Sequence, residues 1–203
     1  MTTYVEVIPA SQGLLPSPCP ECIWWQSTQA AQGEAADPER RIDWMSHLEH
    51  SWGSVGLIAL DGPTTVASVQ FAPVRSLPRP HLLPPGSPPD EAALIYCLRG
   101  RVGRPARETR QLLHRALSHL RKRQVWDVYA YARPLGGKHV CGMRNMFGRE
   151  FLEANGFEVV GKHGDVVLMR VDLRGLLPMF SEAGLAVRRA AHPGHPSPAA
   201  YSK

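Results

Sequence analysis

The N-terminal half of the chain contains one helical pattern followed by two strand patterns. Asp37 is followed by proline, which suits the N-cap and first position of a helix, and apolar residues then recur at helical spacing, so we predict a helix over 38–52. Short apolar runs at 55–60 and 65–71, separated by an Asp-Gly turn, predict two antiparallel strands. The pattern therefore places a helix before a hairpin.

The C-terminal half begins with a continuous apolar run at 92–98, which is typical of a strand buried on both faces. Leucine and alanine then occupy positions 112, 113, 116, 117 and 120, a spacing that predicts a helix with one apolar face. Gly156 is typical of the residue that ends a helix. The remaining predicted elements are a strand at 125–132, a helix at 143–155, and strands at 157–160 and 166–173.

Proline-rich segments flank and separate these elements. We expect residues 1–22 to be an irregular N-terminal segment and residues 72–90 to be a loop, because prolines interrupt both. The folded domain then spans 23–174, followed by an amphipathic helix over 175–190 and a disordered tail over 191–203. The order of elements predicts an α/β (α+β) fold, with a mixed central sheet flanked by helices.

Composition narrows the class of protein. The chain has 203 residues, 43% of them hydrophobic, which suffices for the core of one domain. No apolar run is long enough for a transmembrane helix, and residues 1–15 lack the pattern of a signal peptide, so we expect no membrane partner. Four cysteines without a secretion signal indicate reduced thiols and a cytoplasmic protein.

Positive charge is concentrated between Arg99 and Arg123. This window holds nine basic residues and one acidic residue, Glu108, whereas the net charge of the whole chain is +5. Charge gathered on a strand exit and the following helix indicates a polyanionic ligand, and a solvated helix face is the alternative. The nine basic residues are Arg99, Arg101, Arg104, Arg107, Arg110, Arg115, Arg121, Lys122 and Arg123.

Three segments resemble the GNAT acyltransferase superfamily. Residues 19–26, Cys-Pro-Glu-Cys-Ile-Trp-Trp-Gln, resemble the N-terminal signature of a set of bacterial GNAT proteins. The strand, loop and helix over 92–120 resemble the acyl-CoA-binding core, and residues 151–157 resemble the C-terminal helix that ends in Gly-Phe. The resemblance spans about residues 20–173. It implies a GNAT-like mixed central sheet and the transfer of an acyl group from coenzyme A to an amine.

The resemblance also implies which residues hold the acyl donor. The strand before the loop ends at Leu98 and Arg99, whose backbone N–H groups would hold the acyl carbonyl and its oxyanion. The pyrophosphate would lie at the start of the next helix, where N–H groups and the helix dipole favour anions. The candidate ligands for the donor phosphates are Arg101, Arg104, Arg107, Thr109 and Arg110.

The resemblance also implies which residues bind the amine acceptor. The N-terminal segments shape the acceptor pocket in the superfamily, so Trp24, Trp25 and Tyr131 are candidates to bind the amine, with core packing as the alternative for the tryptophans. The amine must lose a proton before it attacks, and a carboxylate or a water chain acts as the base. The candidate bases are Glu49, Asp90 and Glu91.

The loop departs from the superfamily pattern, which reads Gln/Arg-x-x-Gly-x-Gly/Ala. Aligned on Leu112 and Leu113, the chain keeps the leading basic position at Arg104 but has Arg-Glu-Thr at 107–109 in place of Gly-x-Gly. Bulky residues keep a backbone away from phosphate. The tyrosine that many members use to protonate the leaving thiolate falls at Leu152, which has no proton to donate.

These departures leave three functions open. The first is an acyl-CoA-dependent N-acyltransferase that acylates a small-molecule amine, with arginines as ligands for the phosphates. The second is a GNAT-fold transferase that moves an amino acid from aminoacyl-tRNA to an amine, with the nine basic residues in contact with tRNA. The third is a non-catalytic GNAT relic that binds a ligand or partner.

Cys19 and Cys22 have the spacing of zinc ligands, but a structural zinc site needs four ligands. Nothing in the sequence selects the other two from the remaining thiols and imidazoles. Packed thiols near the tryptophans are the favoured interpretation, so we expect no metal.

Overall fold

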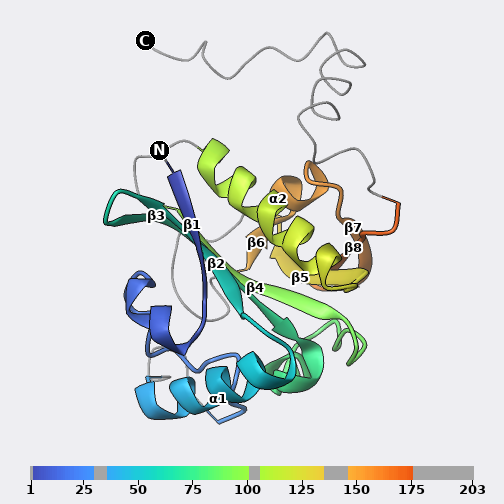
Figure 1. Cartoon of the computed structure of the whole chain (residues 1–203). Coiled ribbons are helices and arrows are strands. Elements are labelled where there is room, and N and C mark those ends of the chain that lie inside the picture. Colours follow the sequence, from blue (N-terminus) through green and yellow to red (C-terminus); the bar gives the residue numbers. More distant parts are fainter. Residues whose placement is uncertain (1, 30–35, 101–105, 135–145, 176–203) are drawn as a thin grey trace, which may run out of the picture.

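The computed structural model describes residues 2–29, 36–100, 106–134 and 146–175. In these residues the strands form one mixed sheet in the order β1-β2-β3-β4-β5-β8-β7, with β6 on β5 (Figure 1). The strands are β1 (Thr2–Glu6), β2 (Gly56–Asp61), β3 (Thr64–Pro73), β4 (Ala93–Gly100), β5 (Asp127–Arg133), β6 (Phe147–Gly148), β7 (Glu158–His163) and β8 (Val166–Asp172). The helices are α1 (Pro38–Ser51), α2 (Ala106–Lys122) and α3 (Arg149–Glu153), with 3-10 turns at Pro9–Leu14, Val74–Ser76 and Arg79–Leu82. The predicted mixed sheet flanked by helices is confirmed.

Local signals place α1 and the hairpin after it where the sequence predicts them. The Asp37 carboxylate accepts a hydrogen bond from the backbone N–H of Arg40 at 3.0 Å, which satisfies an N–H that the helix leaves unpaired. The strands β2 and β3 pair antiparallel across a turn at Gly62, whose φ of +57° lies in the left-handed region. The predicted helix over 38–52 and the predicted hairpin are confirmed.

The prediction that residues 1–22 are irregular is wrong at its start. Residues Thr2–Glu6 form β1, which pairs antiparallel with β2 from Thr2 opposite Asp61 to Glu6 opposite Leu57. The prolines that predict irregular structure begin only at Pro9, and β1 lies before them. The strand gains its hydrogen bonds from β2, whose paired residues lie 51 to 59 positions further along the chain, and no local pattern predicts the strand.

The predicted helix over 143–155 is shorter in the structure. α3 covers only Arg149–Glu153, and Phe147–Gly148 form the short strand β6 instead. The chain leaves the helix through Gly156, whose φ of +87° supports the prediction that this glycine ends the helix. Residues 143–145 lie outside the described residues, as do the predicted helix and tail after residue 175.

Two apolar cores lie on opposite faces of the sheet. One face packs against α2, through the side chains predicted to form its apolar face, together with Leu152 of α3. The other packs against α1, through Met45 and Leu48, and against the segment that carries Trp24 and Trp25. Figure 1 shows α1 and α2 on different sides of the strands. Each helix therefore shields one face of the sheet from water.

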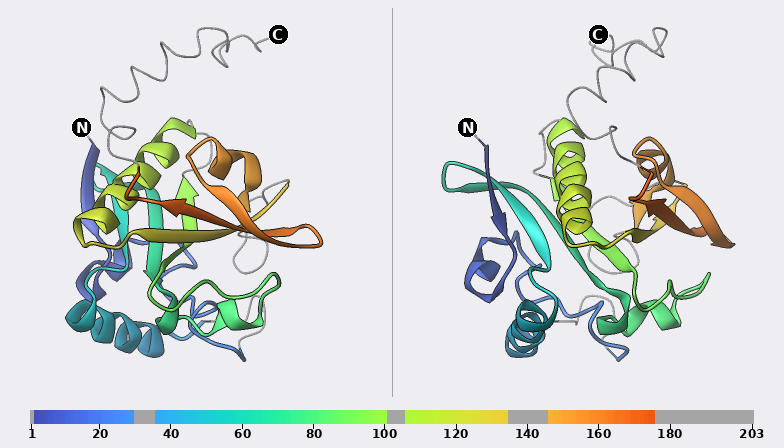
Figure 2. Two further views of the ribbon diagram at one scale, coloured as in Figure 1. Left: turned by 90° about the vertical axis from the view of Figure 1, so that its right-hand side faces the viewer. Right: turned by 45° about the vertical axis from the view of Figure 1, so that its right-hand side comes forward.

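The central strands β4 and β5 run parallel but pair over only two positions. Ala93 lies opposite Val128 and Leu94 opposite Tyr129, and no further pair joins these strands among the described residues. Beyond Leu94, β4 stays paired with β3, whereas β5 stays paired with β8 and takes β6 on its other edge at Ala132 and Arg133. In the left view of Figure 2, β2–β4 run steeply while β5 and β8 run across them. The sheet therefore opens between β4 and β5.

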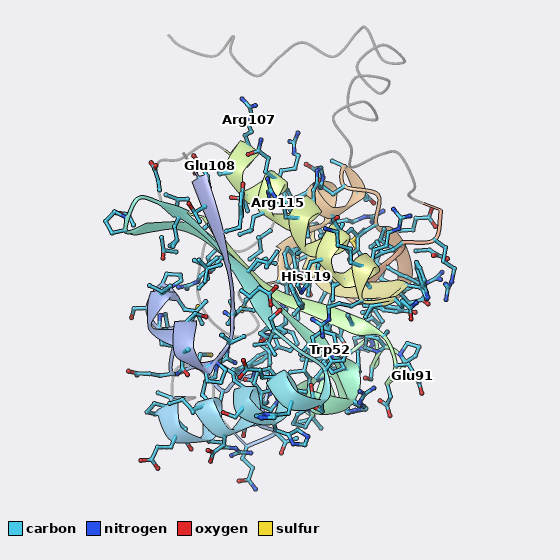
Figure 3. The ribbon with its side chains drawn as sticks, in the orientation of Figure 1. Trp52, Glu91, Arg107, Glu108, Arg115 and His119 are labelled. Carbon is cyan, nitrogen blue, oxygen red and sulfur yellow. The ribbon has the colours of Figure 1, made fainter. Side chains whose placement is uncertain are left out.

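A cation–aromatic contact joins the end of α2 to the chain before β2. The Arg123 guanidinium lies 3.8 Å from the ring centroid of Trp52, donates to the Ser54 carbonyl at 2.9 Å and also donates to the Trp52 carbonyl. One turn earlier, His119 Nε2 lies 3.1 Å from Ser54 Oγ. Figure 3 labels Trp52 and His119 in this region. The contact fixes α2 against the sheet from the C-terminal end of the helix.

We expect Arg123→Ala to destabilise the protein by about 2 kcal/mol, because it removes the contact with Trp52 and leaves two carbonyls without their donor. The matched control is Lys122→Ala, because this lysine is exposed, and its free energy of unfolding should change by less than about 0.5 kcal/mol. Urea unfolding of both variants measures the difference. Equal stability of the two variants would contradict the structural role of Arg123.

His119 gives the stability a dependence on pH. Burial lowers the pKa of His119, the Glu6 carboxylate raises it, and the charges of Arg123 and Lys122 lower it further. The unfolded chain therefore binds a proton more readily than the native protein does. The free energy of unfolding should fall as the pH drops from about 6.5 through the lower native pKa, and His119→Gln should flatten this dependence. Urea unfolding across this range measures it, and an unchanged slope in the variant refutes the assignment.

Candidate functional site

The opening between β4 and β5 leaves one edge of β4 without a strand partner. Beyond Leu94 the described residues show no strand pairing on this edge of β4, while its other edge pairs with β3 as far as Gly100. Leu98, Arg99 and Gly100 are half-buried, so the strand becomes accessible as it leaves the core. An unpaired strand edge offers N–H and C=O groups to a ligand. This edge is the candidate site.

The helix α2 begins just after the open strand edge. Only residues 101–105, which lie outside the described residues, separate β4 from Ala106. The two elements meet closely, because a Cβ at Gly100 would lie 2.6 Å from Thr109 Oγ1. A side chain at this position would make the Thr109 hydroxyl turn away, so Thr109 lies beside the strand exit. The start of α2, with its N–H groups and positive dipole end, belongs to the site.

Trp25 bridges the opening on the side of α1. Its ring centroid lies 5.8 Å from that of Tyr96 on β4 and 6.1 Å from that of Tyr131 on β5, with the Tyr131 ring nearly parallel. The Tyr131 hydroxyl donates to the Gly86 carbonyl at 2.6 Å, and burial raises its pKa. Trp24 meets Trp25 edge to face, with centroids 4.8 Å apart. The structure thus brings the predicted acceptor residues together, and all three are buried.

Several arginines of the basic window are engaged in the fold itself. Arg99 donates to the Ser17 carbonyl at 2.8 Å, and the Arg115 guanidinium lies 3.9 Å from the ring centroid of Tyr4. Together with Arg123 they hold the N-terminal segments and β2 against the rest of the sheet. The charge count alone therefore overstates the basic surface that a ligand can reach.

The cations left at the start of α2 are Arg107 and Arg110, and both are exposed. Figure 3 shows Arg107 at the free upper end of the helix, pointing away from the body of the protein. Arg121 is half-buried and Lys122 is exposed at the opposite end of the helix. Arg101 and Arg104 lie outside the described residues, so their assignment to donor phosphates stays a prediction.

The structure does not bring the candidate bases to the strand exit. Asp90 and Glu91 are exposed and precede β4, at the end where β4 and β5 are still paired. Figure 3 shows Glu91 and Arg107 near opposite ends of the molecule. Glu49 is exposed on α1, whose buried face carries Met45 and Leu48. All three carboxylates are therefore surface groups.

Sequence analysis missed three buried polar residues on the α1 side of the sheet. Arg41, Gln70 and Tyr96 are each at most 2% exposed, on α1, β3 and β4 respectively. The signal for Arg41 was its phase, because Met45 and Leu48 follow it by four and seven residues and share its helix face.

Cys19, Cys22 and Cys97 are present as thiols, and Cys19 and Cys97 are buried. Within the described ranges no group of three histidine, cysteine or acidic residues is arranged to hold a metal ion. In the same part of the chain no helix is long and apolar enough to cross a membrane.

No family model and no curated protein matches this chain. Solved structures do match it in fold. The PaiA N-acetyltransferase of Thermoplasma acidophilum, in complex with coenzyme A, aligns with a TM-score of 0.55 and 13% identity over 85% of this chain and 99% of its own. YncA of Salmonella typhimurium, with acetyl-CoA, aligns with a TM-score of 0.53 and 12% identity over 85% of this chain and 94% of its own.

A GNAT-family protein of Desulfovibrio desulfuricans aligns with a TM-score of 0.50 and 12% identity over 85% of this chain and 99% of its own. The chain has the GNAT fold. The fold that the three sequence segments implied is therefore confirmed.

Proposed function

We propose that this protein is a GNAT-fold N-acyltransferase, which moves an acyl group from acyl-CoA to a primary or secondary amine of a small molecule. The observation that carries the proposal is the parting of β4 from β5 after Leu94, with α2 starting just beyond the open strand edge. Two solved structures of this fold, PaiA and YncA, hold coenzyme A or acetyl-CoA, which supports acyl-CoA as the donor.

The open edge of β4 supplies what acyl transfer needs. A backbone N–H at Leu98 or Arg99 that faces the open edge would donate a hydrogen bond to the acyl carbonyl of the thioester and stabilise the oxyanion that forms when the amine attacks. The nitrogen–carbon bond forms first, and when the oxyanion collapses back to a carbonyl the carbon–sulfur bond breaks and its electron pair leaves with the thiolate. The amine's extra proton passes to solvent. The strand holds the carbonyl in place, so attack becomes a unimolecular step.

The start of α2 would hold the phosphates of the donor. The helix dipole and the unpaired N–H groups of the first turn favour an anion, and Arg107, Thr109 and Arg110 lie in the first turns. Because the loop lacks the glycines of the superfamily, the arginine side chains take over part of the binding that backbone groups supply elsewhere. This substitution predicts that donor binding depends on salt.

We expect acetyl-CoA to bind in the micromolar range in a calorimetric titration. Arg107→Ala and Arg110→Ala should each weaken binding about two- to fivefold, because each removes an exposed cation from near a phosphate, and should reduce the dependence on salt. Lys122→Ala is the matched control at the other end of the helix and should bind as the parent does.

Two other results of the same measurements would favour one of the two alternative functions. Absence of acetyl-CoA binding, with tight and steeply salt-dependent binding of bulk tRNA, would move the donor to aminoacyl-tRNA. The engagement of Arg99, Arg115 and Arg123 within the fold argues against that donor, because these three of the nine basic residues already contact a carbonyl or an aromatic ring. Binding of acetyl-CoA without turnover for any amine would indicate a non-catalytic relic.

Water is the proposed acceptor of the amine proton, because Glu49, Asp90 and Glu91 are all on the surface. We expect Glu49→Gln, Asp90→Asn and Glu91→Gln each to keep kcat/KM within about twofold of the parent, whereas loss of a general base costs about a hundredfold or more. Steady-state release of coenzyme A measures this. A hundredfold loss in any one of the variants would identify that carboxylate as the base.

A further inference from the structure

A buried cation lies beneath the opening on the α1 side of the sheet. The Arg41 side chain is 1% exposed and donates a hydrogen bond from Nη2 to Oε1 of Gln70 on β3. Its guanidinium carbon lies 5.2 Å from the ring centroid of Trp44, a contact that contributes some stabilisation but carries no negative charge. Among the described residues no carboxylate forms an ion pair with Arg41.

The hydrogen-bonding capacity of this cluster is largely unused. Arg41 Nε has no acceptor, and the proton of the Tyr96 hydroxyl, which is 2% exposed on β4, has none either. Burial raises the pKa of Tyr96 to about 12, although the charge of Arg41 and a side-chain hydrogen bond from Arg41 to the hydroxyl act in the opposite direction. The hydroxyl is therefore protonated at neutral pH. Two hydrogen-bond donors, Arg41 Nε and the Tyr96 hydroxyl, therefore lie in one buried cluster with the positive charge of Arg41.

Such an arrangement is costly unless an anion completes it. A buried charge that lacks a counterion loses the hydration that it had in water, and neutral amides return only part of it. The planar guanidinium presents Nε and an Nη as a fork that matches the two oxygens of a carboxylate. The unused Nε and the unused hydroxyl proton of Tyr96 are both donors, so the missing partner is an acceptor.

The cluster lies where a substrate would react. Tyr96 is two residues beyond Leu94, the last residue of β4 that pairs with β5, and its ring packs against Trp25, which bridges the two strands. Residues 23–29, which carry Trp25 and contain no helix or strand, cover this side. The cluster is therefore next to the place proposed for the acyl carbonyl, on the side of the sheet opposite α2.

We propose that Arg41, Tyr96 and Gln70 form a subsite for a carboxylate of the substrate. The Arg41 guanidinium binds the two carboxylate oxygens, the Tyr96 hydroxyl donates to one of them, and Gln70 fixes the plane of the guanidinium. A substrate reaches the subsite by displacing the loop at 23–29. The subsite selects substrates that carry a negative charge close to the reacting centre.

This inference rests on the proposed acyltransferase function and names its substrate class. The carboxylate has two sources with the same chemistry. It belongs to the acceptor, as in an amino acid, or to the acyl group, as in the succinyl group of succinyl-CoA. Both place a carboxylate a few bonds from the carbonyl that the amine attacks.

The experiment compares matched substrates with and without the carboxylate. Acetyl-CoA is supplied with a panel of amino acids and with the corresponding amino acid amides, and succinyl-CoA is compared with acetyl-CoA using the amides as acceptors. Release of coenzyme A gives kcat/KM for each pair. We expect at least a tenfold preference for the carboxylate in one arm, and the arm that shows it identifies the source.

Substitutions at Arg41 and Tyr96 test whether these residues cause the preference for substrates with a carboxylate. Tyr96→Phe keeps the ring and removes one donor to a charged group, so the preference should fall about tenfold to a hundredfold. Arg41→Gln should abolish it, and Arg41→Lys, which keeps the charge but loses the fork, should restore only part. Arg40→Gln is the matched control, because Arg40 is an exposed arginine on the same helix.

Three results would overturn the inference. The first is turnover with equal kcat/KM for substrates with and without the carboxylate, whether it is varied in the acceptor or in the acyl group. The second is a preference that Tyr96→Phe and Arg41→Gln leave unchanged. The third is a preference that Arg40→Gln removes as fully as Arg41→Gln does. Absence of acetyl-CoA binding would show that the proposed function is wrong, and the subsite is then tested without turnover. The unfolding temperatures of the parent and of Tyr96→Phe are measured with and without millimolar succinate or amino acids. The subsite predicts a larger rise for the parent, and equal rises refute it.

Discussion

The separation of β4 from β5 is the constraint on which the rest of the structure depends. Two central strands that stayed paired would close the sheet, and no backbone group of β4 would be open to a ligand. The partners on the outer sides hold them apart, because β3 keeps β4 as far as Gly100 while β8 and β6 keep β5. Each strand therefore remains stable although it lacks one neighbour. The two helices lie on opposite faces of the sheet that is divided in this way, so the opening has one side near α2, where we propose that the donor binds, and one side near α1, where we propose that the acceptor binds.

The basic residues divide into a group that contacts other parts of the fold and a group at the start of α2, although they are adjacent in sequence. Arg99, Arg115 and Arg123 contact carbonyls or aromatic rings of the N-terminal half and hold α2 and the strand exit in place. Arg107 and Arg110 remain exposed at the start of α2. A charge count cannot make this distinction, because it depends on which ring or carbonyl the fold brings within reach. The same is true of Arg41, which is of interest because none of the described carboxylates forms an ion pair with it.

The sequence predicts the elements whose signals are local. The Asp37 cap, the Asp-Gly turn and the apolar run at 92–98 are each readable within a few residues, and the structure confirms them. The sequence does not predict β1, because this strand is defined by its pairing with β2. It does not predict the separation of β4 from β5 either, because the apolar run continues through the point where the pairing stops. For the site, the sequence predicts Trp25 and Tyr131 as neighbours in one pocket, and their rings do stack. The burial of Arg41 is harder to predict, because its position on the buried face of α1 favours burial while its charge favours the surface.

The central claim is that the open edge of β4 binds the acyl donor, and amide hydrogen exchange with and without acetyl-CoA tests it most directly. The account predicts that saturating acetyl-CoA slows exchange at residues 95–100 and in the first turn of α2, because strand-edge and helix N-terminal N–H groups become hydrogen-bonded to the ligand. Slower exchange that spares residues 95–100, or no change while acetyl-CoA is bound, would contradict the account.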